Sequence, residues 1–350
     1  MSEAVHAAVD AILSRAISDR VFPGAVVEAG RAEGALFTRT SGAFTYDAPR
    51  KAVTPLTIYD LASLTKVLST APLLAALIES GKVKLNDRVR HWIASWTGEE
   101  RQIVTLRDLL EHSSGLPAHR RYFETREGRA SFEIAICEEP LEYAPRTQSI
   151  YSDPGFMLLG FALENAANTP LDRQFDAWRE RELGADIEVQ YRPGREWFER
   201  IAPTERMPSG DVRCGEVHDE NAFALGGVAS HAGLFGTAAA VGACARWWMR
   251  SPLLPLFATK TTVPNSSRAL AWDTMLPTSS CGTQMSPDAI GHTGFTGTSL
   301  WIDPANDLYV VILSNRVHPT RDGEGIQEVR RALHDAIVTG LRAGAAAPAD

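Results

Sequence analysis

Lysine is scarce in this sequence. Only five of its 350 residues are lysine, against thirty arginines, and no tract rich in basic residues occurs. The formal net charge is −8 and the isoelectric point is about 5.7. Binding to nucleic acid or to an anionic membrane needs a basic surface. We therefore expect neither nucleic acid nor a membrane among the partners.

Cysteine and long apolar runs are also lacking. The four cysteines lie far apart and form no Cys-x-x-Cys pair, which predicts free thiols in a reducing compartment. The first twenty residues, MSEAVHAAVDAILSRAISDR, lack the basic start and continuous apolar stretch of a secretory signal. No uninterrupted run of 18 apolar residues is present, so no transmembrane helix is expected. These absences predict a cytoplasmic protein.

Strand-like patterns lie near both ends of the chain. They cover FPGAVVEAGR (22–31), GALFTRTSGAF (34–44), IGHTGFTGTSLWIDP (290–304) and DLYVVILSN (307–315). We expect the first two to pair through a turn, and the last two to be adjacent antiparallel strands. Amphipathic helices are predicted at 4–18 and 325–341. One antiparallel sheet, flanked by helices and built from both chain ends, is the expected core.

The middle of the chain is mostly helical in pattern. TLRDLLEHSSGLP predicts a helix with Thr105 as its N-cap, and TAAAVGACARWWMR predicts one with Thr237 as its N-cap. DPGFMLLGFALENAAN predicts another apolar helix. The expected fold class is therefore α/β plus α. Residues 1–77 and 265–350 form the sheet region, and residues 78–264 form an inserted, mainly helical region.

The stretch YDLASLTKVLST (59–70) holds one of the rare lysines. Ser63 and Lys66 are three residues apart, which places both on one face of a helix that Pro72 should kink or split. A desolvated lysine can lose its proton, whereas an arginine in a protein practically never does. Lys66 could thus activate the Ser63 hydroxyl as a nucleophile. The alternative is a solvated Lys66 with Ser63 as a helix N-cap.

Three further motifs follow in order. They are EHSSGLP (111–117), YSD (151–153) and HTG (292–294). Together with Ser-x-x-Lys they resemble the serine β-lactamase and penicillin-binding-protein superfamily, and most closely its class C β-lactamase-like branch, which includes esterases and DD-peptidases. LIESGKVKLNDRV and HTGFTGTSLWIDPANDLYVVILSNR resemble that branch too, so the resemblance covers most of the chain. It implies an active site in the cleft between the two regions.

The resemblance implies a role for each motif residue. Ser63 would be the nucleophile, at a helix N-terminus that favours a developing alkoxide. Lys66 would be its base, neutral or sharing a proton in a desolvated site. Tyr151 would pass a proton to the leaving group. The backbone N–H groups of Ser63 and Phe295 would form the oxyanion hole.

Other residues are expected to bind substrate. Thr293 and Gly294 lie on a strand along which substrate could pair as an added strand. Ser114 is expected to point into the cleft. Arg316 could hold a substrate carboxylate, or it could be an ordinary surface charge at a strand end.

Two positions depart from the pattern of the superfamily. His292 stands where many members have Lys, and an unperturbed His titrates near pH 6.5. A charged His292 would therefore help to bind an anionic substrate only on the acid side. Asp153 stands where β-lactamases usually have Asn, and an ionised Asp cannot donate an N–H to a substrate amide. Asp153 could instead pair with Lys66 and oppose its deprotonation, so efficient β-lactamase action is not expected.

Another polar cluster lies in GEVHDENAFALGGVASHAGLFGTA. It contains His218, Asp219, Glu220 and His231. Histidines and carboxylates bind zinc, but this spacing matches no zinc motif. The superfamily is metal-free, and the equivalent region borders the site in relatives. We therefore expect a loop that lines the pocket, with no metal and no organic cofactor.

The expected function is that of a serine hydrolase. It would act through a covalent acyl-enzyme on a small-molecule ester, amide or β-lactam. A DD-peptidase, a D-amino-acid amidase and a weak β-lactamase are alternatives. A non-catalytic ligand-binding or sensor module is an alternative of another class. The sequence names neither the natural substrate nor the oligomeric state.

Overall fold

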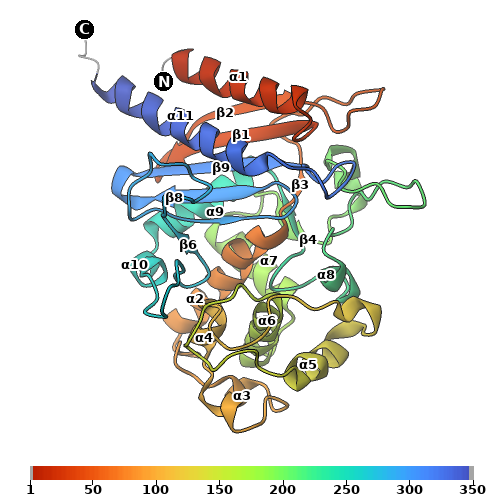
Figure 1. Ribbon diagram of the computed structural model, residues 1–350, viewed down its shortest axis with the longest axis vertical. Coiled ribbons are helices and arrows are strands. Elements are labelled where there is room, and N and C mark those ends of the chain that lie inside the picture. Colours follow the sequence, from red (N-terminus) through yellow and green to blue (C-terminus); the bar gives the residue numbers. More distant parts are fainter. Residues whose placement is uncertain (1–2, 347–350) are drawn as a thin grey trace.

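A six-stranded antiparallel sheet forms the upper part of the molecule (Figure 1). The computed structural model describes residues 3–346. The order across the sheet is β2-β1-β9-β8-β7-β6. The strands are β1 (Gly24–Arg31), β2 (Gly34–Gly42), β6 (Asp273–Thr274), β7 (Ile290–Thr293), β8 (Ser299–Asp303) and β9 (Leu308–Ser314). Because β1 pairs with β9, the two chain ends are joined within one sheet, as predicted.

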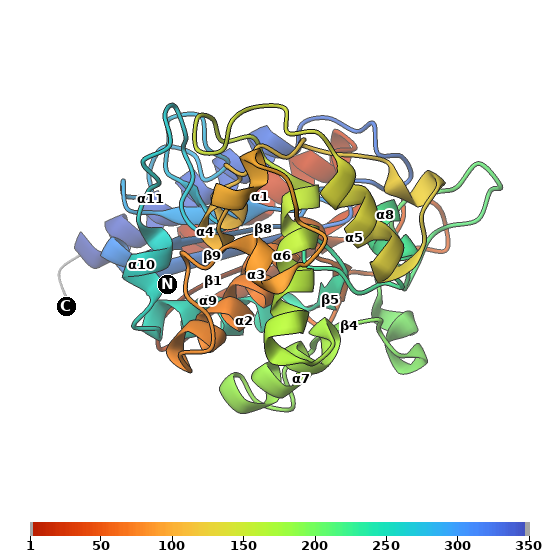
Figure 2. The same ribbon diagram turned by 90° about the horizontal axis from the view of Figure 1, so that it is seen from below.

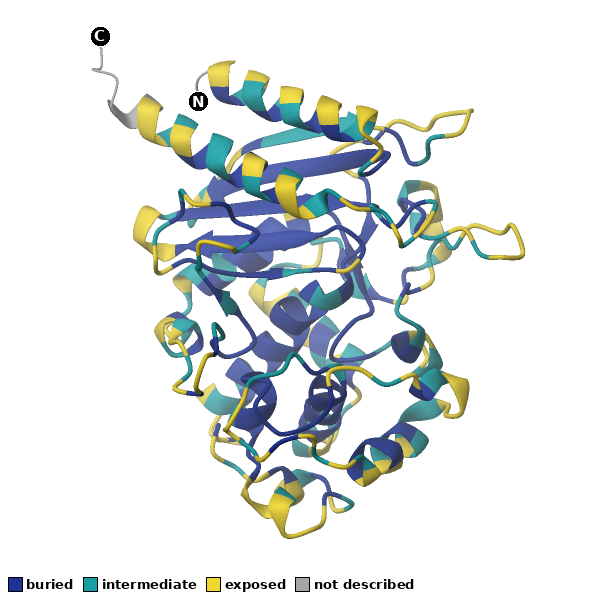
Figure 3. Ribbon diagram, viewed as in Figure 1, coloured by how far each residue is buried: buried dark blue, intermediate teal, exposed yellow. Residues whose placement is uncertain are grey.

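Two helices from opposite ends of the chain lie side by side over the outer face of the sheet (Figure 1). They are α1 (Glu3–Ser18) and α11 (Ile326–Ala346), the second of which runs five residues past the predicted end at Leu341. Buried apolar residues of both helices, including Leu13 and Leu333, share one core with the sheet. Figure 3 shows their exposed residues on the side away from the strands.

Helix α9 (Ala238–Arg250) contacts β1, β8 and β9. Its predicted N-cap is confirmed, since the Thr237 side chain accepts a hydrogen bond from the Ala240 N–H. Trp248 of the Trp-Trp pair is fully buried, and its ring N–H donates to the Val67 carbonyl. This helix lies within 78–264, the range predicted for the helical region, yet it packs on the sheet. The predicted boundaries between the two regions stay a prediction.

The lower part of the molecule is mainly helical, and it faces the viewer in Figure 2. Its elements are α2 (Ala71–Glu79), α3 (Val89–Trp92), α4 (Leu106–Leu110), α5 (Gly128–Glu138), α6 (Asp153–Ala167), α7 (Leu171–Glu182), α8 (Glu220–Ala224) and α10 (Leu254–Ala258). The predicted N-cap Thr105 is confirmed, and it forms a reciprocal capping box with Asp108. The expected fold class is thus the one observed.

A second, three-stranded sheet was not predicted. It consists of β3 (Tyr59–Asp60), β5 (Leu234–Gly236) and β4 (Val189–Tyr191), in the order β3-β5-β4. Strands of two or three residues are too short to show an alternating pattern in the sequence. This small sheet matters because β3 leads directly into the segment that carries Ser63.

The Ser63 segment is not one regular α-helix. A 3-10 turn (Ala62–Leu64) is followed by a π-helical turn (Lys66–Thr70), and α2 begins at Ala71 with Pro72 in its first turn. Pro72 has no N–H to donate to the preceding turn, and the helix changes here from π to α without the predicted split. By length and apolarity, with a mean hydropathy of 1.3, Ala62–Glu79 resembles a membrane span, but 78% of that stretch is buried inside the protein. It is a core helix.

The segment IGHTGFTGTSLWIDP forms two strands rather than the one predicted. β7 ends at Thr293, a tight turn follows, and β8 returns beside it with Thr293 opposite Ser299. The Gly294 N–H donates to the Thr298 carbonyl at 2.7 Å and closes the turn. A Cβ at Gly294 would lie 2.7 Å from the Leu61 carbonyl oxygen, so this turn can approach the Ser63 segment only with glycine there.

Candidate active site

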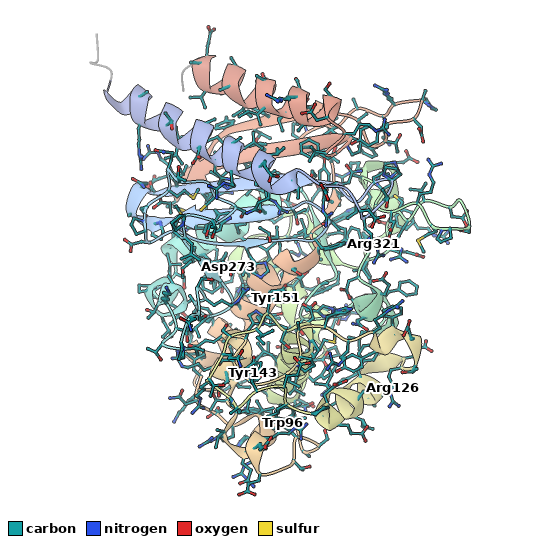
Figure 4. The ribbon with its side chains drawn as sticks, viewed as in Figure 1. Trp96, Arg126, Tyr143, Tyr151, Asp273 and Arg321 are labelled. Atoms are coloured by element: carbon teal, nitrogen blue, oxygen red, sulfur yellow. The ribbon has the colours of Figure 1, made fainter. Side chains whose placement is uncertain are left out.

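A cavity of about 600 Å³ lies between the sheet and the helical part. Figure 4 places Tyr151 in this region, with Asp273 and Arg321 on either side. Residues distant in sequence meet here, and its walls include Ser63, Tyr151, Asp153, His292, Thr293, Gly294, Phe295 and Arg316. Most of the residues predicted for the site are therefore brought together. The volume is typical of a pocket for a small molecule.

Lys66 lies fully buried beside Ser63. Its Nζ is 3.3 Å from the Ser63 Oγ, 2.8 Å from the Asp153 Oδ1 and 3.2 Å from the His231 carbonyl oxygen. The i, i+3 spacing brings the amine to the hydroxyl, as predicted. The alternative of a solvated surface Lys66 is excluded by its complete burial.

Lys66 and Asp153 form a buried ion pair at 2.8 Å. Burial would lower the pKa of the Lys66 amine, but the adjacent Asp153 carboxylate and Tyr151 together outweigh burial and raise that pKa. For Asp153, burial is likewise outweighed by Lys66, His119 and His231 together, which hold the pKa of this carboxyl well below its usual range. The resting pair is therefore an ammonium and a carboxylate. This corrects the expectation of a neutral or proton-sharing Lys66.

Tyr151 lies against Lys66, with the ammonium 4.7 Å from the centre of the phenol ring. Burial raises the pKa of the Tyr151 hydroxyl, and the positive charge of Lys66 opposes the rise. The ring also packs against that of His112, with ring centres 4.7 Å apart. Tyr151 is thus a neutral proton donor in the resting site, close to the Ser63 hydroxyl that lines the same cavity.

His292 lies on β7, and its ring centre is 5.9 Å from that of Tyr151. Its Nδ1 lies 2.9 Å from the Thr293 carbonyl oxygen, while its buried Nε2 has no hydrogen-bond partner among the described residues. Burial, together with the charges of Lys66 and Arg268, lowers the pKa of His292 to about 3. The expectation that His292 titrates near neutrality is therefore wrong, because His292 is uncharged throughout that range.

The turn after β7 carries Phe295, which lines the cavity. Phe295 is half exposed at this turn, and its N–H donates no hydrogen bond to another described residue. The turn is tied to the Ser63 segment, since the Thr298 hydroxyl donates to the Leu61 carbonyl at 3.1 Å. Ser63 is the second residue of the 3-10 turn, in the first turn of a helix where backbone N–H groups lack helical partners. Both predicted oxyanion donors thus belong to segments that touch each other.

Ser114 does not reach the cavity wall. It is buried, and its hydroxyl accepts a hydrogen bond from the Leu116 N–H at 3.4 Å. The EHSSGL loop acts instead through His112, whose Nδ1 accepts from the Ser152 N–H at 2.9 Å and whose ring packs on Tyr151. The substrate-binding role predicted for Ser114 is therefore corrected to a structural one. The loop turns back on itself, and that hides the Ser114 side chain.

Several cavity residues were missed by sequence reasoning. They are His119, Arg268, Asp273, Arg321 and Arg330. A signal was present for Arg330, because it occupies the apolar stripe of α11 together with Leu333 and Ile337. The remaining four lie in loops or short strands, where no periodicity distinguishes them.

The histidine-rich loop forms part of the cavity wall. His218, Asp219 and Glu220 line it. The His218 ring lies 3.1 Å from Glu205, and the His231 ring lies 2.9 Å from Asp219. Each histidine thus has its own carboxylate partner. No group of three potential metal ligands occurs within residues 3–346.

Comparison with known proteins agrees with this arrangement. The model of the family described as Beta-lactamase matches residues 9–334. The chain belongs to the β-lactamase family. It is 34% identical over 324 residues to the "Putative D-alanyl-D-alanine carboxypeptidase" of Escherichia coli (strain K12), an alignment that covers 79% of this chain and 73% of that protein. A Salmonella typhi protein of the same name is 33% identical over 305 residues, 75% of this chain and 70% of that one.

Solved structures of the same fold include proteins described by different activities. The class C β-lactamase from Rhodobacter sphaeroides superimposes with a TM-score of 0.75 at 18% identity, over 95% of this chain and 99% of that one. EstCE1, described as a hydrolase with promiscuous acyltransferase activity, has a TM-score of 0.76 at 18% identity, over 96% and 99%. At such identities the likeness establishes the fold of this β-lactamase-family protein, and substrate choice rests on the residues of its own cavity.

Proposed function

We propose that this β-lactamase-family protein hydrolyses small esters or amides through an acyl-enzyme on Ser63. The observation that carries the proposal is the 3.3 Å separation of the Lys66 Nζ and the Ser63 Oγ at the wall of a cavity also lined by Tyr151. A nucleophile needs a base within hydrogen-bond reach. A sensor module that bound ligand without chemistry would need none of these groups.

The proton route follows from the charges of the site. Lys66 first releases a proton to solvent, a step that the negative charge of Asp153 opposes. Its neutral amine then accepts the Ser63 hydroxyl proton as Oγ bonds to the substrate carbonyl carbon. Tyr151 donates its proton to the leaving oxygen or nitrogen and recovers one from the Lys66 ammonium. The backbone N–H groups of Ser63 and Phe295 would stabilise the tetrahedral oxyanion. Water then attacks the acyl-enzyme by the reverse sequence and releases the acid.

The experiment that tests this function is intact-protein mass spectrometry combined with turnover. Wild type and Ser63→Ala are incubated with a p-nitrophenyl ester, a peptide ending in D-alanyl-D-alanine, and a chromogenic cephalosporin. We expect a mass increase equal to the acyl group in wild type and none in Ser63→Ala, with ester turnover lost in the variant. Equal ester turnover by the two folded proteins would exclude Ser63 as the nucleophile.

A second candidate, hydrolysis of peptides with a free terminal carboxylate, is favoured by Arg330. This buried guanidinium lines the cavity beside the Phe295 turn and donates to the carbonyls of Gly294 and Thr298 at 3.0 and 2.7 Å. It has no carboxylate partner in residues 3–346, and its Nε is unpaired. Burial and Arg316 lower its pKa to about 9, so it stays cationic at neutral pH. Such a cation would attract a substrate carboxylate, a part that neutral His292 cannot play.

Paired substrates separate the two candidates. An ester that carries a carboxylate is compared with its neutral methyl ester in wild type and in Arg330→Gln. If Arg330 binds the substrate carboxylate, the ratio of kcat/KM for the charged substrate to kcat/KM for the neutral substrate should fall about 10-fold or more in the variant. If Arg330 only holds the turn, both substrates should lose activity equally.

A further inference from the structure

Asp60 is a buried carboxylate three residues before Ser63. It ends strand β3, and both of its oxygens accept backbone hydrogen bonds. Oδ1 accepts from the Ala62 N–H at 2.8 Å, and Oδ2 accepts from the His218 N–H at 2.6 Å. Asp60 makes no salt bridge with the residues that the structure describes, and it does not line the cavity. Its two bonds therefore act on the backbone of its neighbours.

The first of these neighbours, Ala62, determines the orientation of Ser63. Ala62 has a φ of +47°, a left-handed conformation that costs a residue with a Cβ about 1–2 kcal/mol. The strained residue directly precedes Ser63 and sets the direction of the Ser63 N–H and Oγ. The bond from the Ala62 N–H to Asp60 holds this conformation. Strain that is held by a buried carboxylate beside a reactive group indicates a functional constraint.

The second neighbour holds the Phe295 turn. The ring of His218 stacks on the ring of Phe295, with ring centres 5.7 Å apart and planes 25° from parallel. The Asp60 carbonyl also accepts a hydrogen bond from the Thr296 hydroxyl at 2.7 Å. Asp60 is therefore linked to the Phe295 turn in two ways. Its side chain acts through His218, and its backbone carbonyl acts through Thr296. Asp60 thus contacts, directly or through His218, both of the segments that carry the predicted oxyanion donors, Ser63 and Phe295.

We propose that Asp60 is a positioning residue that sets the backbone N–H groups of Ser63 and Phe295 at the spacing an oxyanion needs. The inference rests on the proposed function, because it assumes that these two N–H groups form an oxyanion hole. Two donors that approach one oxygen must be placed within a few tenths of an ångström before the reaction, since their contribution comes from preorganisation.

The charge of Asp60 works against stability, which points to function. Burial raises the pKa of the Asp60 carboxyl to about 6, while the N–H groups of His218 and Ala62 oppose the rise; Asp219 adds to it and Arg213 opposes it. The folded protein thus binds this proton more tightly than the unfolded chain does. Stability therefore rises as the pH falls through about 6. Above that pH Asp60 is ionised, and its ionisation lowers the free energy of unfolding of the protein.

The test uses Asp60→Asn with Asp303→Asn as a matched control. Asp303 is another fully buried carboxylate that accepts hydrogen bonds, from the N–H and hydroxyl of Ser286, but it lies at the far end of β8, outside the cavity wall. Asn keeps the shape and one acceptor of Asp60 and loses the second acceptor. Each variant is assayed at pH 8 for kcat and KM on a p-nitrophenyl ester. Binding of a boronic acid is also measured, because its tetrahedral adduct on Ser63 mimics the oxyanion.

We expect kcat of Asp60→Asn to fall about 10- to 100-fold with KM changed less than about 3-fold, and boronate affinity to fall in parallel. Asp303→Asn should keep both near wild type at a similar melting temperature. Equal losses in the two variants, or a change confined to KM, would show a structural role and overturn the inference. Wild type without turnover or acylation would overturn the proposed function as well, whereas an active wild type with an equally active Asp60→Asn overturns this inference alone.

Discussion

Asp153 decides whether Lys66 can act as a base at neutral pH. The two groups form an ion pair at 2.8 Å inside the protein, with His119 at 3.8 Å from the other carboxylate oxygen. Burial alone would lower the pKa of Lys66, and the carboxylate, together with Tyr151, reverses that effect. Because the proposed mechanism needs the neutral amine, this single residue should place the working pH range of the proposed hydrolysis on the alkaline side.

Replacement of Asp153 by Asn should move that working range. Without the negative charge, burial dominates and the pKa of Lys66 falls. The rise of kcat/KM with pH for a neutral ester should therefore shift to lower pH by about one unit or more, measured from pH 5 to 10. Asn also offers an N–H to a substrate amide, so cephalosporin turnover should gain more than ester turnover.

Asp273→Asn is the matched control for this prediction. Asp273 is a carboxylate of the same cavity that pairs with Arg268 at 2.7 Å rather than with Lys66. Its loss should leave the position of the pH profile unchanged. An equal shift in both variants, or none in Asp153→Asn, would mean that Asp153 does not control Lys66.

At the scale of elements, α9 reaches the sheet because Gly242 has no side chain. A Cβ there would collide with the Glu28 carboxylate and lie 2.9 Å from the Tyr309 hydroxyl. Below the helix, Tyr309 donates to Glu28 at 2.9 Å and accepts from Arg246 at 2.7 Å. Burial raises the pKa of Glu28, which these partners oppose. The side chains of Glu28, Tyr309 and Arg246 thus form a hydrogen-bonded network between helix α9 and the sheet.

Gly242→Ala should therefore destabilise the protein. In an exposed helix the same change stabilises by about 1 kcal/mol, whereas overpacking at this contact should cost about 1–3 kcal/mol. Urea unfolding measures the sign of this change in the free energy of unfolding. Gly34→Ala, where a Cβ would meet nothing within 4 Å, serves as the control and should change stability by less than about 0.5 kcal/mol. A more stable Gly242→Ala would show that the contact is loose.

At the scale of the whole molecule, the two chain ends complete one core. Helices α1 and α11 cover the sheet face formed by strands from both ends, and Leu13, Val27 and Ile312 are fully buried between them. We call the apolar residues between these two helices and the sheet the outer core. Since the cavity lies against the same sheet, we expect the outer core and the site to unfold together. The helices contribute through packing of their apolar faces, which supplies most of the stability of helices in proteins.

Leu13→Ala tests that expectation. Removal of a fully buried Leu side chain should cost about 3 kcal/mol, within the usual range for such changes. Urea unfolding followed by tryptophan fluorescence and by loss of ester turnover should shift to the same lower midpoint. Leu36→Ala, at a position 40% exposed on β2, should cost less than about 0.5 kcal/mol. Turnover that survives while fluorescence reports unfolding would show that the outer core is a separate unit.

Local rules were sufficient for a large part of this molecule. The strands near both ends, the long terminal helices and the caps Thr105 and Thr237 follow from periodicity and from side chains that bond a backbone a few residues away. The Ser63–Lys66 contact is of the same kind, because i and i+3 share a helix face. Residue order alone therefore indicated the joining of both chain ends in one sheet and the reactive pair, but not the division of residues 290–304 into β7 and β8.

The charges and contacts of the site depended on the tertiary structure. Lys66 is cationic because Asp153 lies beside it, His292 is neutral because it is buried among cations, and Asp60 reaches a backbone 158 residues away. Ser114, which resembles a cleft residue in its motif, is turned inward by its loop. Desolvation and Coulomb interactions depend on distance in space and on exclusion of water. A linear pattern records neither, so these properties were decided only when the chain folded.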